Sequence, residues 1–197
     1  DAGKTVEESM ALVRSLLPTD IRLTSRIAPH CGAIMADPVQ LHQIIVNLIT
    51  NSFQAMAPRG GGNIEVSLER VALEGEADGI GPGAYVCLKV ADEGPGIGPD
   101  LLPKIFEPYF TTKAQDKGTG MGLAVVHGIV KGHGGGIHVE STPGEGTRFD
   151  ILFPIMGKQI ISETEGLKKL PTGNEHILFI DDEDFLIDLG KNMLKKL

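Results

Sequence analysis

Several residue types are scarce in this 197-residue sequence, and each shortage excludes a class of protein. There is no tryptophan and there are two tyrosines, so we do not expect an aromatic platform for stacking nucleic-acid bases. Basic residues number 18 against 26 acidic ones, and the net charge of −8 argues against nucleic acid or an anionic membrane as a partner. No apolar run approaches the roughly 18–20 residues that cross a bilayer, so no membrane segment is expected in this sequence.

Cysteine is also scarce. Cys31 and Cys87 match no metal-binding or redox spacing, and two cysteines are too few for a disulfide framework. We therefore expect two reduced thiols in a cytosolic setting. The first residues hold no basic stretch followed by an apolar core, so they do not have the pattern of a signal peptide, and we expect them to continue a longer chain.

Glycine, by contrast, is abundant, with 26 residues or about 13% of the chain against the usual ~7%. It gathers in clusters at 60–62, 94–96, 118–122 and 144–146. The third cluster opens a predicted helix, where free backbone N–H groups and close backbone approach suit a phosphate. The stretch 113–131 holds three lysines and one aspartate, so it is locally positive. A plain glycine hinge in a loop is the alternative.

Hydrophobic periodicity and turn residues predict an alternation of helices and strands. The predicted helices are 5–17, 37–56, 100–106 and 120–132, and the predicted strands are 21–27, 32–36, 63–72, 84–91, 137–141 and 147–153. Asp37 and Pro38 are a strong helix start, with Asp as N-cap and Pro at the first helical position.

The helix predicted at 37–56 carries amides where a solvated helix would carry charges. Between Pro38 and Pro58 there is no Asp, Glu, Lys or Arg. The polar residues are spaced by three and four and share one face: Gln40, Gln43, Asn47, Asn51 and Gln54. Amide oxygens coordinate hard cations such as Mg²⁺, and amide nitrogens donate to phosphate. A ligand-binding wall and a buried hydrogen-bonded seam both fit this pattern.

A carboxylate ends the strand predicted at 84–91. Asp92 is followed by a turn containing Gly94 and Gly96, an arrangement that suits an exocyclic amine on a flat ring, although an ordinary turn has the same sequence. Further on, Phe106 and Phe110 lie four residues apart beside a polar stretch. They would anchor a lid or pack in the core, and for Phe106 we favour core packing.

The order of these motifs resembles the catalytic ATP-binding domain of bacterial sensor histidine kinases over about residues 20–155. The asparagine helix, Asp-x-Gly-x-Gly, Phe-Glu-Pro-Tyr-Phe, Gly-x-Gly-x-Gly-Leu and Gly-x-Gly-Thr look like its N, G1, F, G2 and G3 boxes. Gln54-Ala55 and Phe110-Thr111-Thr112-Lys113 are most similar to the nitrogen-regulation branch.

The resemblance implies a two-layer α/β (α+β) sandwich of the Bergerat type, with three helices on a mixed sheet, binding ATP and Mg²⁺. It implies that Asn51 coordinates Mg²⁺ with support from Asn47, that Asp92 receives the adenine amine, with Thr147 nearby, and that 107–121 form the lid. The implied ATP-binding set is Asn47, Asn51, Asp92, Gly94, Gly96, Ile97, Phe110, Thr111, Lys113, Lys117, Gly118, Thr119, Gly120, Met121, Gly122, Leu123 and Thr147.

The implied reaction is transfer of the γ-phosphoryl group of ATP to a histidine. Related gyrase-type ATPases carry a glutamate base four residues before the Mg²⁺-binding asparagine, and here that position is Asn47, which cannot act as a base. A hydrolytic ATPase and a non-transferring pseudokinase are the alternatives. None of the six histidines stands in the expected His-Glu/Asp context. We therefore expect the acceptor histidine and the catalytic base on a dimerisation domain outside this chain, and no autophosphorylation by the fragment alone.

The predicted domains are the end of a dimerisation helix (1–17), the catalytic domain (18–155), a linker (156–174) and the start of a receiver domain (175–197). In the last, an apolar strand runs into Asp181 and Asp182, a pair that resembles a receiver's Mg²⁺-binding acids. An acidic cap on a plain helix is the alternative. We expect this segment to pack on the kinase domain or a neighbouring chain, and a receiver or response regulator as partner of a cytoplasmic kinase portion.

Overall fold

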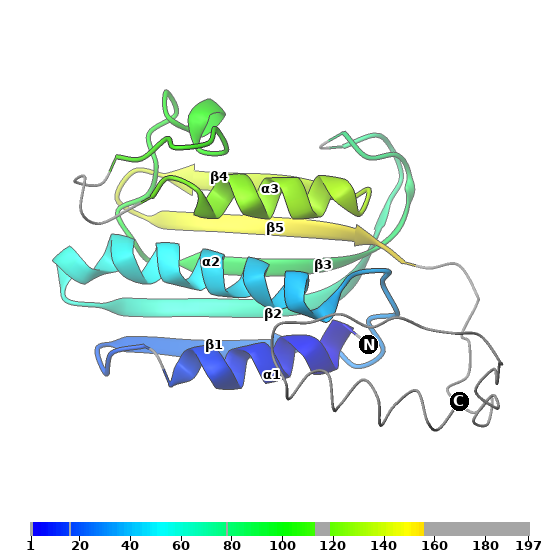
Figure 1. The fold of residues 1–197 in the computed structure, drawn as a ribbon, viewed down its shortest axis with the longest axis horizontal. Helices are drawn as coiled ribbons and strands as arrows, with labels where there is room; N and C mark the ends of the chain where they lie inside the picture. The colour runs from blue at the N-terminus through cyan, green and yellow to red at the C-terminus, as the bar shows by residue number, and fades with distance from the viewer. Residues whose placement is uncertain (1, 16, 78, 113–118, 156–197) are drawn as a thin grey trace, which may run out of the picture. The chain divides into compact units, whose positions relative to one another are not determined.

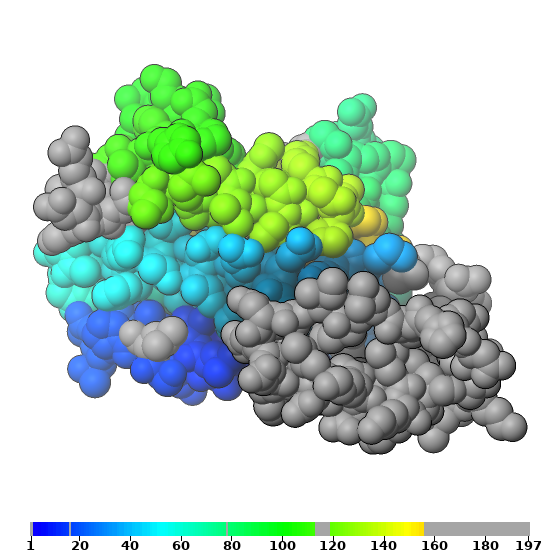
Figure 2. Space-filling model, viewed as in Figure 1, coloured from blue at the N-terminus to red at the C-terminus, as the bar shows by residue number. Residues whose placement is uncertain are grey.

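Three helices cover one face of a five-stranded sheet. The structure, a computed structural model, describes residues 2–15, 17–77, 79–112 and 119–155. Helices α1 (Ala2–Arg14), α2 (Pro38–Met56) and α3 (Gly122–Gly132) form one layer and the sheet forms the other (Figure 1). Figure 2 shows the three helices side by side on this face. The predicted two-layer α/β sandwich is confirmed.

The sheet is mixed, as predicted. Its strands are β1 (Ile21–Ile27), β2 (Gly62–Leu73), β3 (Gly83–Asp92), β4 (Gly136–Thr142) and β5 (Gly146–Pro154). They are ordered β1-β2-β3-β5-β4, with β1 and β2 parallel and the other neighbours antiparallel. A parallel pair needs a long crossover, and α2 supplies it between β1 and β2. The antiparallel pairing brings the end of β3 beside the start of β5.

The hydrophobic core lies between the two layers. Alternate residues of each strand point toward the helices, and the apolar stripe of α2 packs on them. The largest fully buried side chains are Val6, Ile44, Ile45, Leu48, Ile49, Met56, Ile64, Val66, Leu68, Leu88, Ile151 and Phe153. Burial of each such side chain contributes about 1.5–3 kcal/mol, so this core holds α2 firmly against the sheet.

Helix α1 belongs to this core. Val6, Met10 and Val13 are buried and α1 packs along α2, so α1 is the third helix of the layer. The helix predicted at 100–106 is instead a single 3-10 turn, η2 (Leu102–Lys104), because so short a segment forms too few backbone hydrogen bonds to stabilise an α-helix. The assignment of residues 1–17 to a dimerisation helix stays a prediction.

Helix α2 begins and ends at the predicted residues. The Asp37 side chain accepts the Val39 N–H at 2.8 Å, and the chain leaves the helix through η1 (Ala57–Arg59) into the first glycine cluster. The strand predicted at 32–36 is wrong, because Ile34 makes only an isolated bridge to Ile155. The backbone turns at Gly32, which has φ +106°, and Asp37 already caps α2. The segment between these two residues is too short for a regular strand.

The face of the sheet away from the helices is built differently. A small apolar cluster of Ile80, Tyr85, Cys87 and Leu152 lies at one end. Elsewhere on this face charged side chains pair across the strands, as Lys89 does with Glu69 at 2.5 Å. We call this surface the open face of the sheet.

No helix within the described ranges is long and apolar enough to cross a membrane. The predicted linker and receiver segment, with Asp181 and Asp182 and their expected packing, lie outside the described residues.

Candidate functional site

Asp92 stands at the end of β3, and the protein holds both oxygens of its carboxylate. The Ser52 hydroxyl donates to Oδ2 at 2.7 Å, and the Gly94 N–H donates to Oδ1 at 2.9 Å. A carboxylate oxygen has two acceptor positions, so each oxygen keeps one for a ligand. The group is therefore a fixed acceptor that can take a donor such as an amine.

The turn after Asp92 is anchored at several points. Arg59, from the turn after α2, donates to the Gly94 carbonyl at 3.2 Å. Gly96 has φ +70°, and a Cβ there would collide with the Thr142 carbonyl, so only glycine fits this close approach. These contacts fix the conformation of the turn. This supports the expectation that Gly94 and Gly96 shape the adenine end of the site.

Thr147 lies directly beside Asp92. The two residues are partners in the β3–β5 register, and Ser141 is the partner of Thr147 in the β4–β5 register. The hydroxyl oxygens of Thr147 and Ser141 are 2.9 Å apart, and Ser141 accepts the Ile97 N–H at 2.7 Å. A row of polar side chains therefore runs across three strands at this end of the sheet.

Sequence reasoning missed Ser52 and Ser141. Ser52 is 3% exposed on the apolar face of α2, and a serine at such a position is a usable signal because a buried hydroxyl needs a partner. Ser141 precedes a hairpin turn, where serine is ordinary, so its role could not be read from its position.

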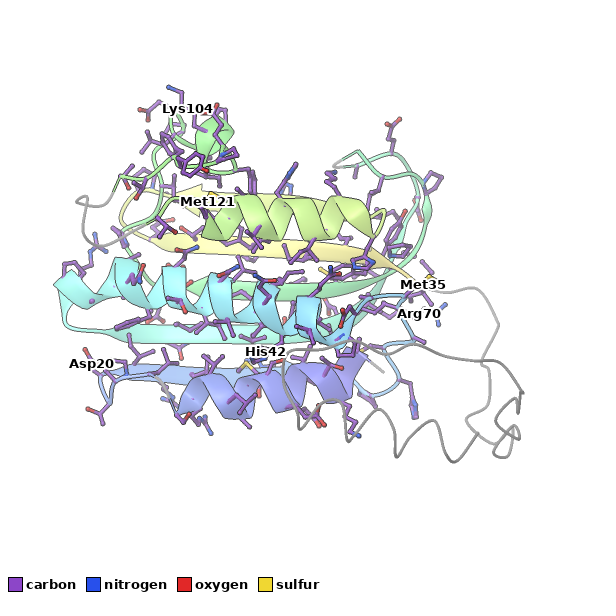
Figure 3. All side chains as sticks on the ribbon, viewed as in Figure 1. Asp20, Met35, His42, Arg70, Lys104 and Met121 are labelled. Atoms are coloured by element: carbon purple, nitrogen blue, oxygen red, sulfur yellow. The ribbon has the colours of Figure 1, made fainter. Side chains whose placement is uncertain are left out.

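Asn47 and Asn51 meet the beginning of α3. A Cβ built on Gly122 would lie 3.6 Å from Asn51 Nδ2 and 3.7 Å from Asn47 Oδ1. Met121, labelled in Figure 3, precedes the helix and its side chain does not cap it. The first residue of α3 thus lies close to the asparagine pair, and the helix that begins there has unpaired N–H groups in its first turn.

The two ends of the predicted lid are joined through the backbone. The Tyr109 N–H donates to the Gly120 carbonyl at 3.0 Å. Both residues have positive φ, +67° and +66°, and a Cβ on Gly120 would collide with the Tyr109 backbone. Tyr109 is 76% exposed. Residues 113–118 of the predicted lid, which include Lys113, Lys117 and Gly118, lie outside the described residues.

The remaining predicted residues near the lid serve the backbone or the core. Phe110 donates its N–H to the Glu107 carbonyl at 3.2 Å, and Thr119 accepts the Met121 N–H through its hydroxyl at 3.4 Å. Thr111 is exposed. Ile97 and Leu123 pack, partly buried, against the main core.

Phe106 also packs against this core, and its ring centroid lies 5.3 Å from that of His127. The core interpretation of Phe106 is therefore confirmed.

The amide stripe of α2 divides into two parts. Gln40, near the start of the helix, is 2.7 Å from Nε2 of His133, just past the end of α3. This contact is a seam between helices, whereas Asn47 and Asn51 lie at the opposite end of α3. The hydrogen-bonded seam is therefore confirmed for Gln40, and the ligand-binding wall stays a prediction for Asn47 and Asn51.

The donor set fits a metal that arrives with its ligand. Within the described residues, no group of three or more His, Cys, Asp or Glu side chains could hold an ion alone. Asn47 and Asn51 offer amide oxygens, and Mg²⁺ binds oxygen ligands while keeping waters and substrate phosphates in its shell. The asparagine pair therefore suits Mg²⁺ bound together with a phosphorylated ligand.

The fold and these motifs define an ATP-binding domain. The family of histidine kinase-, DNA gyrase B- and HSP90-like ATPases matches residues 36–156, and the chain belongs to this family. Within it, the chain carries the ATP-binding catalytic domain of sensor histidine kinases.

Relatives from several bacteria are similar along most of the chain. Sensor kinase CckA of Brucella abortus is 34% identical over 93% of this chain and 21% of its own length. Sensor histidine kinase ZraS of Escherichia coli is 43% identical over 79% of this chain and 30% of its own. Sensory histidine kinase/phosphatase NtrB of Salmonella typhimurium is 33% identical over 77% and 42%. The chain thus spans less than half of these relatives.

Solved structures agree with the architecture. Full-length ShkA, crystallised in complex with AMPPNP, has a TM-score of 0.61 and 26% identity over 78% of this chain and 30% of its own. The catalytic domain of histidine kinase ThkA has a TM-score of 0.60 and 27% identity over 77% and 90%.

Proposed function

We propose that this domain binds ATP with Mg²⁺ and transfers the γ-phosphoryl group to a histidine of a dimerisation domain, giving phosphohistidine and ADP. The observation that carries the proposal is the pairing of two half-sites on α2. Ser52 reaches the fixed carboxylate of Asp92, and its neighbour Asn51 reaches the start of α3. A nucleotide would place its purine base at Asp92 and its phosphates at the start of α3.

At the base end, Asp92 accepts the adenine 6-amino group, and Thr147 contributes a hydroxyl beside it. Gly94, Gly96 and Ile97 shape this end of the pocket. At the phosphate end, backbone N–H groups at the start of α3 point toward negative charge. The residues proposed there are Phe110, Thr111, Lys113, Lys117, Gly118, Thr119, Gly120, Met121, Gly122 and Leu123.

Asn51, supported by Asn47, is the proposed protein ligand of Mg²⁺. When bound, Mg²⁺ neutralises charge that develops on the phosphates during transfer. Asn47 and Asn51 hold the nucleotide, and neither amide can take a proton from water. This chemistry favours transfer to a protein over hydrolysis.

The acceptor histidine is proposed to lie on a separate dimerisation domain. Three of the five described histidines have side-chain contacts within the domain: His133 with Gln40, His138 with Glu140 and His127 with the tilted ring of Phe106. These are structural contacts that support an acceptor elsewhere.

Residues 175–197 are proposed as the start of a receiver domain, with Asp181 and Asp182 as its acids. The alignment with CckA supports continuity of this segment with the kinase, because it covers 93% of the chain and so continues beyond residue 155. We further propose a cytoplasmic location, where ATP is available, and a receiver or response regulator as the downstream partner.

Calorimetry with Mg²⁺–ATP tests the site. Asp92→Ala and Asn51→Ala should each weaken binding at least about 10-fold, because each removes a polar contact with the ligand. Asp150→Asn is the matched control, since Asp150 is a strand aspartate of the open face that pairs with Arg148. Undiminished binding in both site variants would contradict the proposal.

The placement of the acceptor has its own test. Incubation of the chain alone with γ-labelled ATP should give no acid-labile, base-stable label, whereas addition of a histidine-bearing dimerisation domain should. Labelling of the isolated chain on histidine would show that the acceptor is internal.

A further inference from the structure

We propose that Ser52 is a positioning residue that sets the preference for a purine with an amino group at position 6. This inference rests on the proposed function and deepens it. Ser52 acts through Asp92, and no direct contact of Ser52 with the nucleotide is required. The starting point is one hydrogen bond, from the Ser52 hydroxyl to Asp92 Oδ2 at 2.7 Å.

The position of Ser52 is otherwise apolar. Its neighbours on the inner face of α2 are Leu48, Ile49 and Met56, all at most 1% exposed, and Ser52 itself is 3% exposed. Alanine would be a better helix former there and would need no hydrogen-bond partner. The hydroxyl therefore has an evident use only in its bond from the helix to the carboxylate on the sheet.

The carboxylate of Asp92 is held from two sides. The Gly94 N–H comes from the turn that follows it, and the Ser52 hydroxyl comes from α2. With one donor alone, the carboxylate could turn about its last side-chain bond. With two, the remaining acceptor positions keep fixed directions. A ligand amine that meets them gains a hydrogen bond, whereas a ligand carbonyl in the same place meets another acceptor.

Ser52 is adjacent in the chain to a residue of the phosphate end. Its chain neighbour Asn51 has its amide nitrogen 3.6 Å from a Cβ built on Gly122. The same turn of α2 therefore orients the base acceptor and borders the phosphate-facing helix. The hydroxyl should affect recognition of the base while leaving the phosphate contacts intact.

The test compares two ligands on three proteins. Mg²⁺–ATP and the Mg²⁺ complex of purine riboside triphosphate, which lacks the 6-amino group, are titrated by calorimetry into wild type, Ser52→Ala and Ser9→Ala. Ser9 is the matched control: it is 2% exposed on α1, and its hydroxyl bonds within its own helix, to the Thr5 carbonyl at 2.7 Å.

The expected result is a loss that depends on the amine. Ser52→Ala should bind ATP about 5- to 10-fold more weakly, as for a hydrogen bond to a charged group, and the analogue less than about 2-fold more weakly. The preference of wild type for ATP should shrink accordingly, while Ser9→Ala keeps it. If Ser52→Ala melts below the assay temperature, Ser52→Cys, which keeps the size with a weaker donor, should show a smaller loss in the same direction.

Two results would overturn the inference while leaving the proposed function standing. One is an equal loss for both ligands in Ser52→Ala, which would mean a purely structural role. The other is unchanged affinity for both ligands in Ser52→Ala, which would mean that the hydroxyl does not affect recognition of the base. A wild type that does not bind ATP, or does not distinguish it from the analogue, would instead overturn the proposed function together with this inference.

Discussion

The two faces of the sheet use the same strands for different purposes. Toward the helices, residues 86, 88 and 90 of β3 are buried apolar side chains, and the strand ends in a carboxylate held by two donors. On the open face, the intervening Cys87 belongs to the small apolar cluster with Ile80, Tyr85 and Leu152, which we call the satellite cluster. Lys89 pairs with Glu69 across the surface. The candidate site is confined to the helix-covered face.

This difference shows what positions a site. A polar group held between two packed layers has few alternative arrangements, because the surrounding core is close-packed and leaves no space for it to move. Exposed ion pairs are screened by solvent, so they contribute little to stability and hardly restrict the positions of their side chains. We therefore expect changes on the helix-covered face to alter stability and binding strongly, and equivalent changes on the open face to alter them weakly.

The largest contrast should appear in core truncations. Ile44→Ala on α2, which is fully buried, should cost about 3–4 kcal/mol, because it leaves a cavity between the layers. Leu152→Ala in the satellite cluster should cost less, about 2 kcal/mol, because this small cluster can collapse more easily. Urea unfolding measures both, and equal losses would remove the distinction between the two faces.

Two glycines with positive φ give the next contrast. Gly120→Ala should weaken ATP binding about 10-fold, because the new Cβ collides with the Tyr109 backbone and shifts the start of α3. Gly144→Ala carries similar backbone strain at φ +93° but meets no atom within 4 Å. It should cost about 1 kcal/mol of stability and leave the affinity for ATP unchanged. Calorimetry and thermal melting separate the two effects.

Cys87 makes the stability of the satellite cluster depend on pH. Burial, followed by the nearby charge of Asp150, raises the pKa of the Cys87 thiol from 9.0 to about 12. The folded state therefore favours the protonated thiol, and this stability is complete below pH 9 and lost as the pH rises toward 12.

At pH 10 the loss should be about 1.4 kcal/mol relative to neutral pH, and Cys87→Ala should lack this part of the pH slope. In the native protein at pH 8, Cys87 and the buried Cys31 should react slowly with a thiol reagent. Fast reaction of Cys87 without denaturant would contradict its burial.

The smallest effect is expected for the ion pair between Lys89 and Glu69 on the open face. Lys89→Met should cost less than about 1 kcal/mol and still less in 0.5 M salt, because the pair with Glu69 is partly exposed. The hydrogen bond to Glu69 raises the pKa of Lys89, so the pair is intact at neutral pH and is lost only as the pH rises past that pKa. A loss above 2 kcal/mol would show that this face contributes more than a solvated surface.

Periodic segments could be predicted from the sequence, and short or long-range features could not. The bounds of α2 follow from Asp37, Pro38 and an unbroken apolar stripe. The segments at 32–36 and 100–106 have too few residues for a period, so the surrounding structure decides their conformation. An amphipathic helix was predicted at 5–17, but its residues were assigned to a dimerisation helix, whereas α1 packs in the helix layer of this domain. Periodicity reveals an apolar face but not the element that covers it.

The candidate site divides in the same way. Asp92, Asn47 and Asn51 were found because they stand in local motifs with recognisable spacing. Ser52 and Ser141 contribute through partners 40 and 44 residues away in the chain, and no local pattern encodes such distances. Gln40 lies on the same stripe as Asn51, and only the position of His133 separates its role from that of the site.

Asn51 and Ser52 are consecutive residues, and successive side chains on a helix point about 100° apart. One peptide unit thus directs one side chain toward α3 and the next toward β3. The spacing of the two residues on α2 is set by covalent geometry, whereas their partners belong to separate elements. Small shifts of the sheet or of α3 would move one contact at a time, while the spacing of the two anchors stays constant.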